Sequence, residues 1–204
     1  MTTPMETGGL VGWWHRSSPE ARILGVGGTI LLLDHLTKLV IVLTLRLGDH
    51  WAVLPGFLHI VHWGNTGSAW SMFHGNNTAL AAIALVAVGA LWYWRAHFEA
   101  HRPVGQLALG LLFGGTIGNL IDRLIPSRRH VVDFLYFHLH PRGGGEAGFP
   151  AFNVADVAIC TGVGLMLLLG FMMHETAPAP TTKPSSAAPA DAGAPGVPTG
   201  KSAE

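Results

Sequence analysis

Long apolar runs limit what this chain can fold into more than any other feature of its sequence. Four runs approach the length of about 20 residues that a helix needs to cross the hydrocarbon core of a bilayer. They occupy residues 23–45, 78–94, 104–121 and 154–173. A helix satisfies its own backbone hydrogen bonds, so helix is the expected state of each run in lipid. The sequence predicts an all-α membrane protein with four transmembrane helices.

The rest of the chain divides into three parts around these runs. We expect a cytoplasmic N-terminal segment at 1–21, a four-helix membrane domain at 22–174 and an Ala/Pro-rich cytoplasmic tail at 175–204. The tail is too poor in large apolar residues to bury a core, which predicts disorder. The first run lacks a cleavage site, and we expect it to be its own uncleaved insertion signal.

Charge is sparse and balanced. Only 12% of the residues are charged, and the formal net charge is zero, which gives no reason to expect a nucleic-acid partner. Arginines flank the runs on both sides, so the positive-inside rule does not decide the orientation. The single cysteine, Cys160, excludes an internal disulfide.

One segment between the first two runs favours β-structure. Residues 57–63, "FLHIVHW", are rich in aromatic and β-branched residues and follow the turn signal Pro55-Gly56. This pattern predicts a short strand or hairpin that lies on the membrane surface.

Several polar residues occur where an apolar run would exclude them. Asp34 and Lys38 stand four residues apart in the first run and therefore share a helix face. They form either a self-neutralising pair that permits insertion or a pair that braces polar loops. Asp122 and Arg123, at the end of the third run, either cap a helix at the interface or belong to a site.

Two further acids lie close to apolar residues. Asp133 is flanked by Val132 and Phe134, an unusual setting for a plain loop. Asn153 and Asp156 stand three apart at the start of the fourth run, where an acid also meets the favourable end of the helix dipole. The helix dipole does not explain why Asn153 and Asp133 also occur beside apolar residues.

These polar residues should gather at one membrane face, because the topology puts both inter-run connections on the same side. The residues concerned are Asn65, Asn119, Asp122, Arg123, Asp133, Asn153 and Asp156. Such a cluster indicates one functional site.

Five motifs in order resemble signal peptidase II, the bacterial prolipoprotein signal peptidase family. They are "DHLTK", "NTGSAW", "GGTIGNLIDR", "VVDF" and "FNVAD", and they extend over about residues 23–171. The resemblance implies an aspartic endopeptidase that cuts the signal peptide from diacylglyceryl-modified prolipoproteins, just before the lipidated cysteine. It implies Asp133 and Asp156 as the catalytic dyad. The supporting residues that it implies are Asp34, Lys38, Asn65, Gly115, Asn119, Arg123 and Asn153.

The resemblance also implies a setting and an inhibitor. The enzyme would lie in the bacterial inner membrane with its active site on the periplasmic side, where a small β-cradle and a short surface helix accompany the four helices. Globomycin-type cyclic peptides would inhibit it. The chain departs from the family pattern in "LIPSRRHVV" (124–132), which lacks the usual glycine, and in the glycine-rich "PRGGGEAG" (141–148).

Two close carboxylates suit peptide hydrolysis, because one can take a proton from water while the other donates a proton to the scissile carbonyl. No metal or cofactor is expected, since the loop histidines lack the companion ligands of a zinc site. Those histidines are His59, His62, His74, His130, His138 and His140.

Two other functions also use polar residues in membrane helices. A proton- or ion-coupled transporter also uses membrane carboxylates, but normally near mid-bilayer and often in duplicated halves. A serine intramembrane protease would need a histidine partner for Ser68 or Ser71 in the third or fourth run, and neither run provides one.

Overall fold

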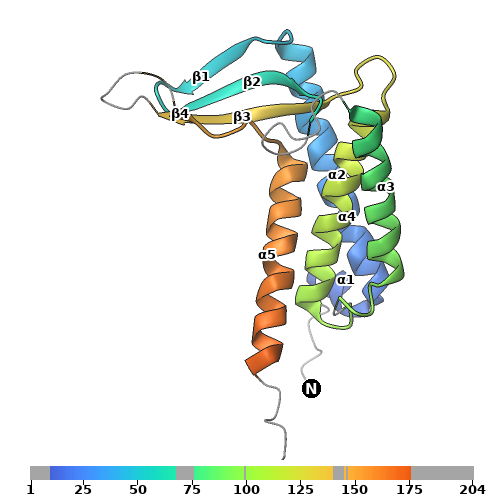
Figure 1. The fold of residues 1–204 in the computed structure, drawn as a ribbon. Helices are drawn as coiled ribbons and strands as arrows, with labels where there is room; N and C mark the ends of the chain where they lie inside the picture. Colours follow the sequence, from blue (N-terminus) through green and yellow to red (C-terminus); the bar gives the residue numbers. More distant parts are fainter. Residues whose placement is uncertain (1–9, 68–75, 99, 140–144, 146, 176–204) are drawn as a thin grey trace, which may run out of the picture.

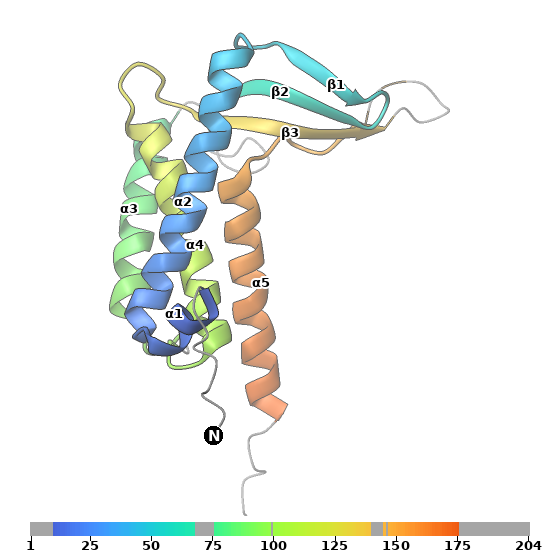
Figure 2. The same ribbon diagram turned by 180° about the vertical axis from the view of Figure 1, so that it is seen from behind.

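The computed structural model describes residues 10–67, 76–98, 100–139, 145 and 147–175. A bundle of long helices carries a small antiparallel sheet at one end, and the sheet extends sideways over α5 (Figures 1 and 2). The chain ends that are described lie at the opposite end of the bundle.

The predicted runs are all helical. The long helices are α2 (Pro19–Thr44), α3 (Asn77–Tyr93), α4 (Pro103–Leu124) and α5 (Val154–Glu175). Ser18 caps α2 by accepting a hydrogen bond from the backbone N of Ala21 at 3.2 Å, and Pro19 suits the first helical turn. This cap explains why α2 begins four residues before the predicted run.

Fewer of the described helices meet the length of a membrane span than the sequence predicted. Three helices within the described ranges, α2, α4 and α5, are long and apolar enough to cross a membrane. The apolar helix α3 has only 17 residues, which is at the lower limit for a span. A further short helix, α1 (Leu10–Arg16), precedes α2 and was not predicted from the sequence.

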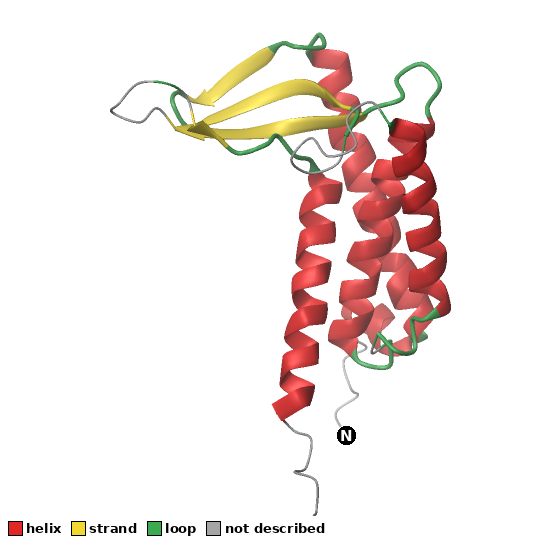
Figure 3. Cartoon of the chain, viewed as in Figure 1, coloured by secondary structure: helices red, strands yellow, loops and turns green. Residues whose placement is uncertain are grey.

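The sheet has the strand order β1-β2-β3-β4, with all neighbours antiparallel (Figure 3). Its strands are β1 (His50–Leu54), β2 (Leu58–Asn65), β3 (Val131–Leu139) and β4 (Ala147–Gly148). The predicted hairpin at 57–63 is confirmed as β1 and β2, joined at a turn where Gly56 has a φ of +77°. The short surface helix is absent from the described residues at the sheet end, where residues 68–75 are not described.

The third strand lies where the sequence predicted only a connection. β3 pairs with β2 so that Asp133 faces Trp63 across the ladder. The first four residues of β3 are all buried. Before this strand, Arg129 takes a φ of 52°, the conformation that glycine adopts most readily. This arginine lies in the segment that departs from the family pattern.

The helix α4 forms the centre of the bundle, because it packs against α2, α3 and α5. Gly110 and Gly114 lie against α2, where added Cβ atoms would meet the backbone oxygens of Ile23 and Gly27. Glycine therefore allows these helices to approach closely, as small residues do in membrane bundles. The outer faces of α2, α3 and α5 expose leucine, isoleucine and valine.

Candidate active site

Asp133 lies near the start of β3 with only 3% of its surface exposed. The side-chain amide of Asn65, at the end of β2, donates a hydrogen bond to its Oδ2 at 2.9 Å. The side-chain amide of Asn153, just before α5, donates to its Oδ1 at 2.8 Å. Both carboxylate oxygens are thus fixed by amide donors from different parts of the chain.

Asp156 occupies the first turn of α5. The Nδ2 of Asn119, on α4, donates to its Oδ1 at 2.8 Å, and the backbone N of Asn153 donates to its Oδ2 at 3.1 Å. In return, the backbone N of Asp156 donates to Oδ1 of Asn153 at 3.0 Å. This reciprocal pattern is that of a helix capping box, so the same residues both begin α5 and position the acid.

Asn153 therefore connects the two acids, because its side-chain amide holds Asp133 and its backbone N holds Asp156. Burial, together with the negative charge of Asp156, raises the pKa of Asp133 to about 7, against the opposing effect of the Asn65 and Asn153 donors. A carboxyl that is half protonated near neutral pH can serve as an acid or a base.

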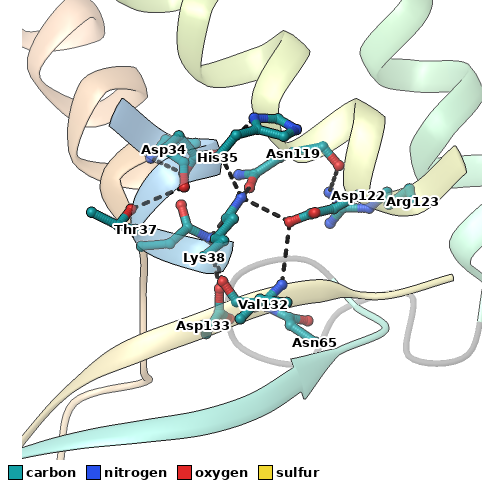
Figure 4. Close-up of polar contacts among 12 residues, drawn as sticks. Asp34, His35, Thr37, Lys38, Asn65, Asn119, Asp122, Arg123, Val132 and Asp133 are labelled. Atoms are coloured by element: carbon teal, nitrogen blue, oxygen red, sulfur yellow. Dashed lines mark hydrogen bonds and ion pairs between the residues drawn. The ribbon is translucent and has the colours of Figure 1, made fainter. Parts of the chain in front are cut away.

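A buried lysine binds three polar side chains next to the two candidate acids (Figure 4). Lys38 Nζ lies 2.7 Å from Oδ2 of Asp34 and 2.8 Å from Oδ2 of Asp122, and donates to Oδ1 of Asn119 at 3.0 Å. All three donors of the ammonium group are used, although only 2% of Lys38 is exposed. The pairing of Asp34 with Lys38 on one helix face is confirmed.

The two acids beside Lys38 also reach backbone groups near the catalytic candidates. Asp34 Oδ1 accepts from the backbone N of Ala155 at 3.0 Å, next to Asp156. Asp122 Oδ2 accepts from the backbone N of Val132 at 3.3 Å, next to Asp133. The ion network thus holds the start of α5 and the start of β3 at the same time.

Asp122 is a residue that the sequence treated only as part of the polar cluster, without a role. Its spacing of three residues from Asn119 places both on one face of α4, and this spacing was the available signal. No sequence pattern indicated the backbone groups of Ala155 and Val132, because no pattern specifies which amides remain free.

Arg123 is used for internal contacts. Its Nη1 donates to the carbonyl of Asn119 at 3.1 Å, and its Nη2 donates to the carbonyl of Gly67 at 3.0 Å. The backbone N of Gly67 in turn donates to Oδ1 of Asn65 at 2.9 Å. Arg123 therefore fixes the backbone that follows β2 and, through it, the amide that holds Asp133.

Gly115 allows α4 and α5 to approach closely below the site. A Cβ atom at this position would lie 2.5 Å from the backbone oxygen of Ala155 and 2.8 Å from Cγ1 of Ile159. The contact with a backbone atom cannot be relieved by a side-chain rotation, so the helices themselves must separate.

We predict that Gly115→Ala destabilises the protein by about 1–3 kcal/mol, the usual cost of overpacking. An alanine in a helix otherwise favours folding over glycine, so the matched variant Gly89→Ala, where nothing lies within 4 Å of the added atom, should be neutral or stabilising. Thermal unfolding in detergent measures both, and equal midpoints for the two variants would contradict the packing argument.

The histidines of the sheet contact one another through their rings. The rings of His59 and His138 have centroids 4.2 Å apart, and His50 stacks on His59 at 4.9 Å. Among the residues described, no group of three His, Cys, Asp or Glu side chains is arranged to hold a metal ion. His74 and His140 lie outside the described residues.

Comparison with known proteins supports the same reading of the motifs. The family model "Signal peptidase (SPase) II" matches residues 26–172. The chain belongs to the signal peptidase II family. A lipoprotein signal peptidase from Bacillus pumilus is 38% identical over 140 residues, which are 68% of this chain and 85% of the relative. One from Symbiobacterium thermophilum is 36% identical over 138 residues, 68% of this chain and 86% of the relative.

The fold agrees with solved structures as well. A structure titled "Bacterial membrane enzyme structure by the in meso method at 2.3 A resolution" has a TM-score of 0.63 at 31% identity and covers 76% of this chain and 89% of that chain. A second, at 1.9 Å resolution, has a TM-score of 0.60 at 32% identity, with 72% and 90% covered. The signal peptidase II motifs therefore occur here on a membrane-enzyme fold, as the resemblance implied.

Proposed function

We propose that this chain is an aspartic endopeptidase that removes the signal peptide from diacylglyceryl-modified prolipoproteins, cutting before the lipidated cysteine, with Asp133 and Asp156 as its catalytic pair. Family membership supports the protease activity on lipoproteins. One observation supports the pair in particular. Asn153 holds both carboxylates, so the two acids are positioned by one residue.

The chemistry follows from two carboxyls that share one proton. The ionised carboxylate takes a proton from a water molecule, which attacks the scissile carbonyl carbon. The protonated carboxyl donates to the carbonyl oxygen as negative charge develops there. As the C–N bond breaks, the proton taken from water passes to the leaving nitrogen. The carboxylate that gave its proton to the carbonyl oxygen takes a hydroxyl proton back from the intermediate, which restores the one shared proton. The raised pKa of Asp133 favours one proton on the pair in the resting enzyme.

The remaining site residues have positioning roles in this proposal. Asn65, Asn119 and Asn153 orient the carboxylates, and Lys38 with Asp34 fixes Asn119 and the start of α5. Arg123 fixes the backbone at Gly67, and Gly115 sets the distance between α4 and α5. Substrate backbone could add hydrogen bonds to the same amides when it binds.

We further propose that α3 is the fourth span and that the sheet lies on the periplasmic side of the inner membrane. Four spans place both termini in the cytoplasm, and the described chain begins and ends at the side of the bundle opposite the sheet (Figure 1). The scissile bond of an exported lipoprotein lies near the outer surface of that membrane, which agrees with acids at the head of α5 rather than at its middle. A transporter has no support, because the buried acids Asp122 and Asp133 lie at the sheet end of the bundle.

The decisive experiment uses the purified chain in lipid vesicles. A diacylglyceryl-modified prolipoprotein peptide should be cut at the bond before the lipidated cysteine, as read by mass spectrometry, and a globomycin-type cyclic peptide should block the cut. The unlipidated peptide is the matched control and should remain intact. Cleavage at another bond, or no difference between the two peptides, would refute the proposed substrate.

A further inference from the structure

An apolar hollow opens among α3, α4 and α5 at the end of the bundle opposite the sheet. Its volume is about 610 Å³, and its lining includes Leu91 of α3, Phe98 of the following turn, Leu112 of α4, and Val163 and Gly170 of α5. An apolar cleft of this size lies within the range that holds ligands in proteins. It lies apart from the polar network around Lys38.

The hollow and the candidate site lie along the same face of α5. Asp156, Val163 and Gly170 are each seven residues apart and therefore lie on one face of the helix. Below the acid this face is not covered by another helix, since Val163 is 45% exposed and Leu167 is 59% exposed. An apolar surface thus leads from the carboxylate to the hollow.

The helix α4 also places a site residue seven positions from a residue that lines the hollow. Asn119, which donates to Asp156, stands seven residues from Leu112, which lines the hollow. Two neighbouring helices therefore each present a polar residue at the site and an apolar residue at the hollow, along the same direction. The path ends at Gly170, where nothing lies within 4 Å of an added Cβ.

We propose that this path holds the apolar helix of the signal peptide, with the residue about 14 positions before the scissile bond in the hollow beside Gly170. This rests on the proposed function. The fourteen residues from Asp156 to Gly170 rise about 21 Å along α5. A signal peptide carries an apolar stretch of about 7–15 residues before its cleavage site, so a helix of that length extends from the acids to the hollow.

The hollow then selects substrates by the length of their apolar signal segment. It accepts the apolar stretch that lies farthest from the cut, whereas the acids act on the bond at the other end. A signal segment too short to reach Gly170 would lose this contact without losing any contact at the carboxylates.

Disulfide crosslinking in vesicles tests this placement without relying on catalysis. The enzyme carries Asp156→Asn, so that substrate persists, and Cys160→Ser, so that no other thiol competes. Gly170→Cys should crosslink to a lipid-modified prolipoprotein with a cysteine about 14 positions before the cut, but not to one with a cysteine about 4 positions before it. Gly164→Cys is the matched control, because it also has open space around it but lies on another face of α5, and it should crosslink to neither.

Kinetics of the active enzyme supply a second readout. Gly170→Trp should raise KM about 10-fold for a full-length substrate, with little change in kcat, because it removes binding that is equal in ground and transition states. It should not affect a substrate truncated to a few residues before the cut, and Gly164→Trp should affect neither.

Absence of a crosslink from Gly170→Cys, or an equal loss with both substrates in Gly170→Trp, would overturn the placement. Cleavage by the unmodified chain would persist in that case, so this failure is distinguishable from failure of the proposed function.

Discussion

Replacing either Asp133 or Asp156 with asparagine should reduce turnover of a lipid-modified prolipoprotein by about 10²–10⁴-fold, the range for loss of a general acid or base. An amide can neither take a proton from water nor exchange one with its neighbour. The loss should appear in kcat, because the substrate backbone and signal helix keep their other contacts. Single-turnover cleavage in vesicles measures it.

The rate losses of the two single variants should not be additive. A pair that shares one proton loses its function when either member is replaced, so the double variant should be about as slow as each single variant. Asp49→Asn is the matched control, since this exposed carboxylate lies at the same end of the molecule and should leave turnover unchanged. A single variant with normal turnover would remove that residue from the catalytic pair.

Lys38→Met should have the largest effect on stability. Methionine has a similar length but no charge, and the change leaves Asp34 and Asp122 buried without their cation. Removing one partner of a buried ion pair costs about 3–5 kcal/mol because the remaining charge is uncompensated. We expect a large fall in the thermal midpoint in detergent, together with loss of activity through the displaced Asn119.

Two further variants separate this explanation from a simple packing defect. Leu36→Met, on the exposed face of the same helix, should leave the midpoint unchanged. Adding Asp34→Asn to Lys38→Met should recover part of the lost stability, since it removes one of the uncompensated charges. Failure of this rescue would mean that the charge of Asp34 does not need Lys38.

The sequence was most informative where physical constraints are strongest. Apolar runs must be helical in lipid, and so the four long helices were predicted to within a few residues. The hairpin at 57–63 was predicted from its turn and its β-branched and aromatic residues. The strand β3 was not predicted, although "VVDFLYF" has the same composition, because the acid at its third position suggested a site rather than a ladder.

The site was predicted as a set of residues but not as a set of contacts. Spacing placed Asn119 and Asp122 on one face, and Asn153 and Asp156 on another, and the structure joins both faces through Lys38 and Asn119. Which amide faces which carboxylate depends on how β3 and α5 approach each other. That approach is set by glycine contacts and backbone donors, such as Gly115 and Ala155, whose partners no sequence pattern specifies.

The most direct test of the shared proton is to follow carboxyl protonation against pH by infrared spectroscopy of the purified enzyme. The wild-type protein should show a buried carboxyl signal that is lost near pH 7, the raised pKa of Asp133, and this midpoint should change in Asp133→Asn. In Asp156→Asn the midpoint should fall, because the neighbouring negative charge is gone, but stay above that of an ordinary aspartate, because burial remains. An unchanged midpoint in Asp156→Asn would contradict the account, since the two acids would then not act as a pair.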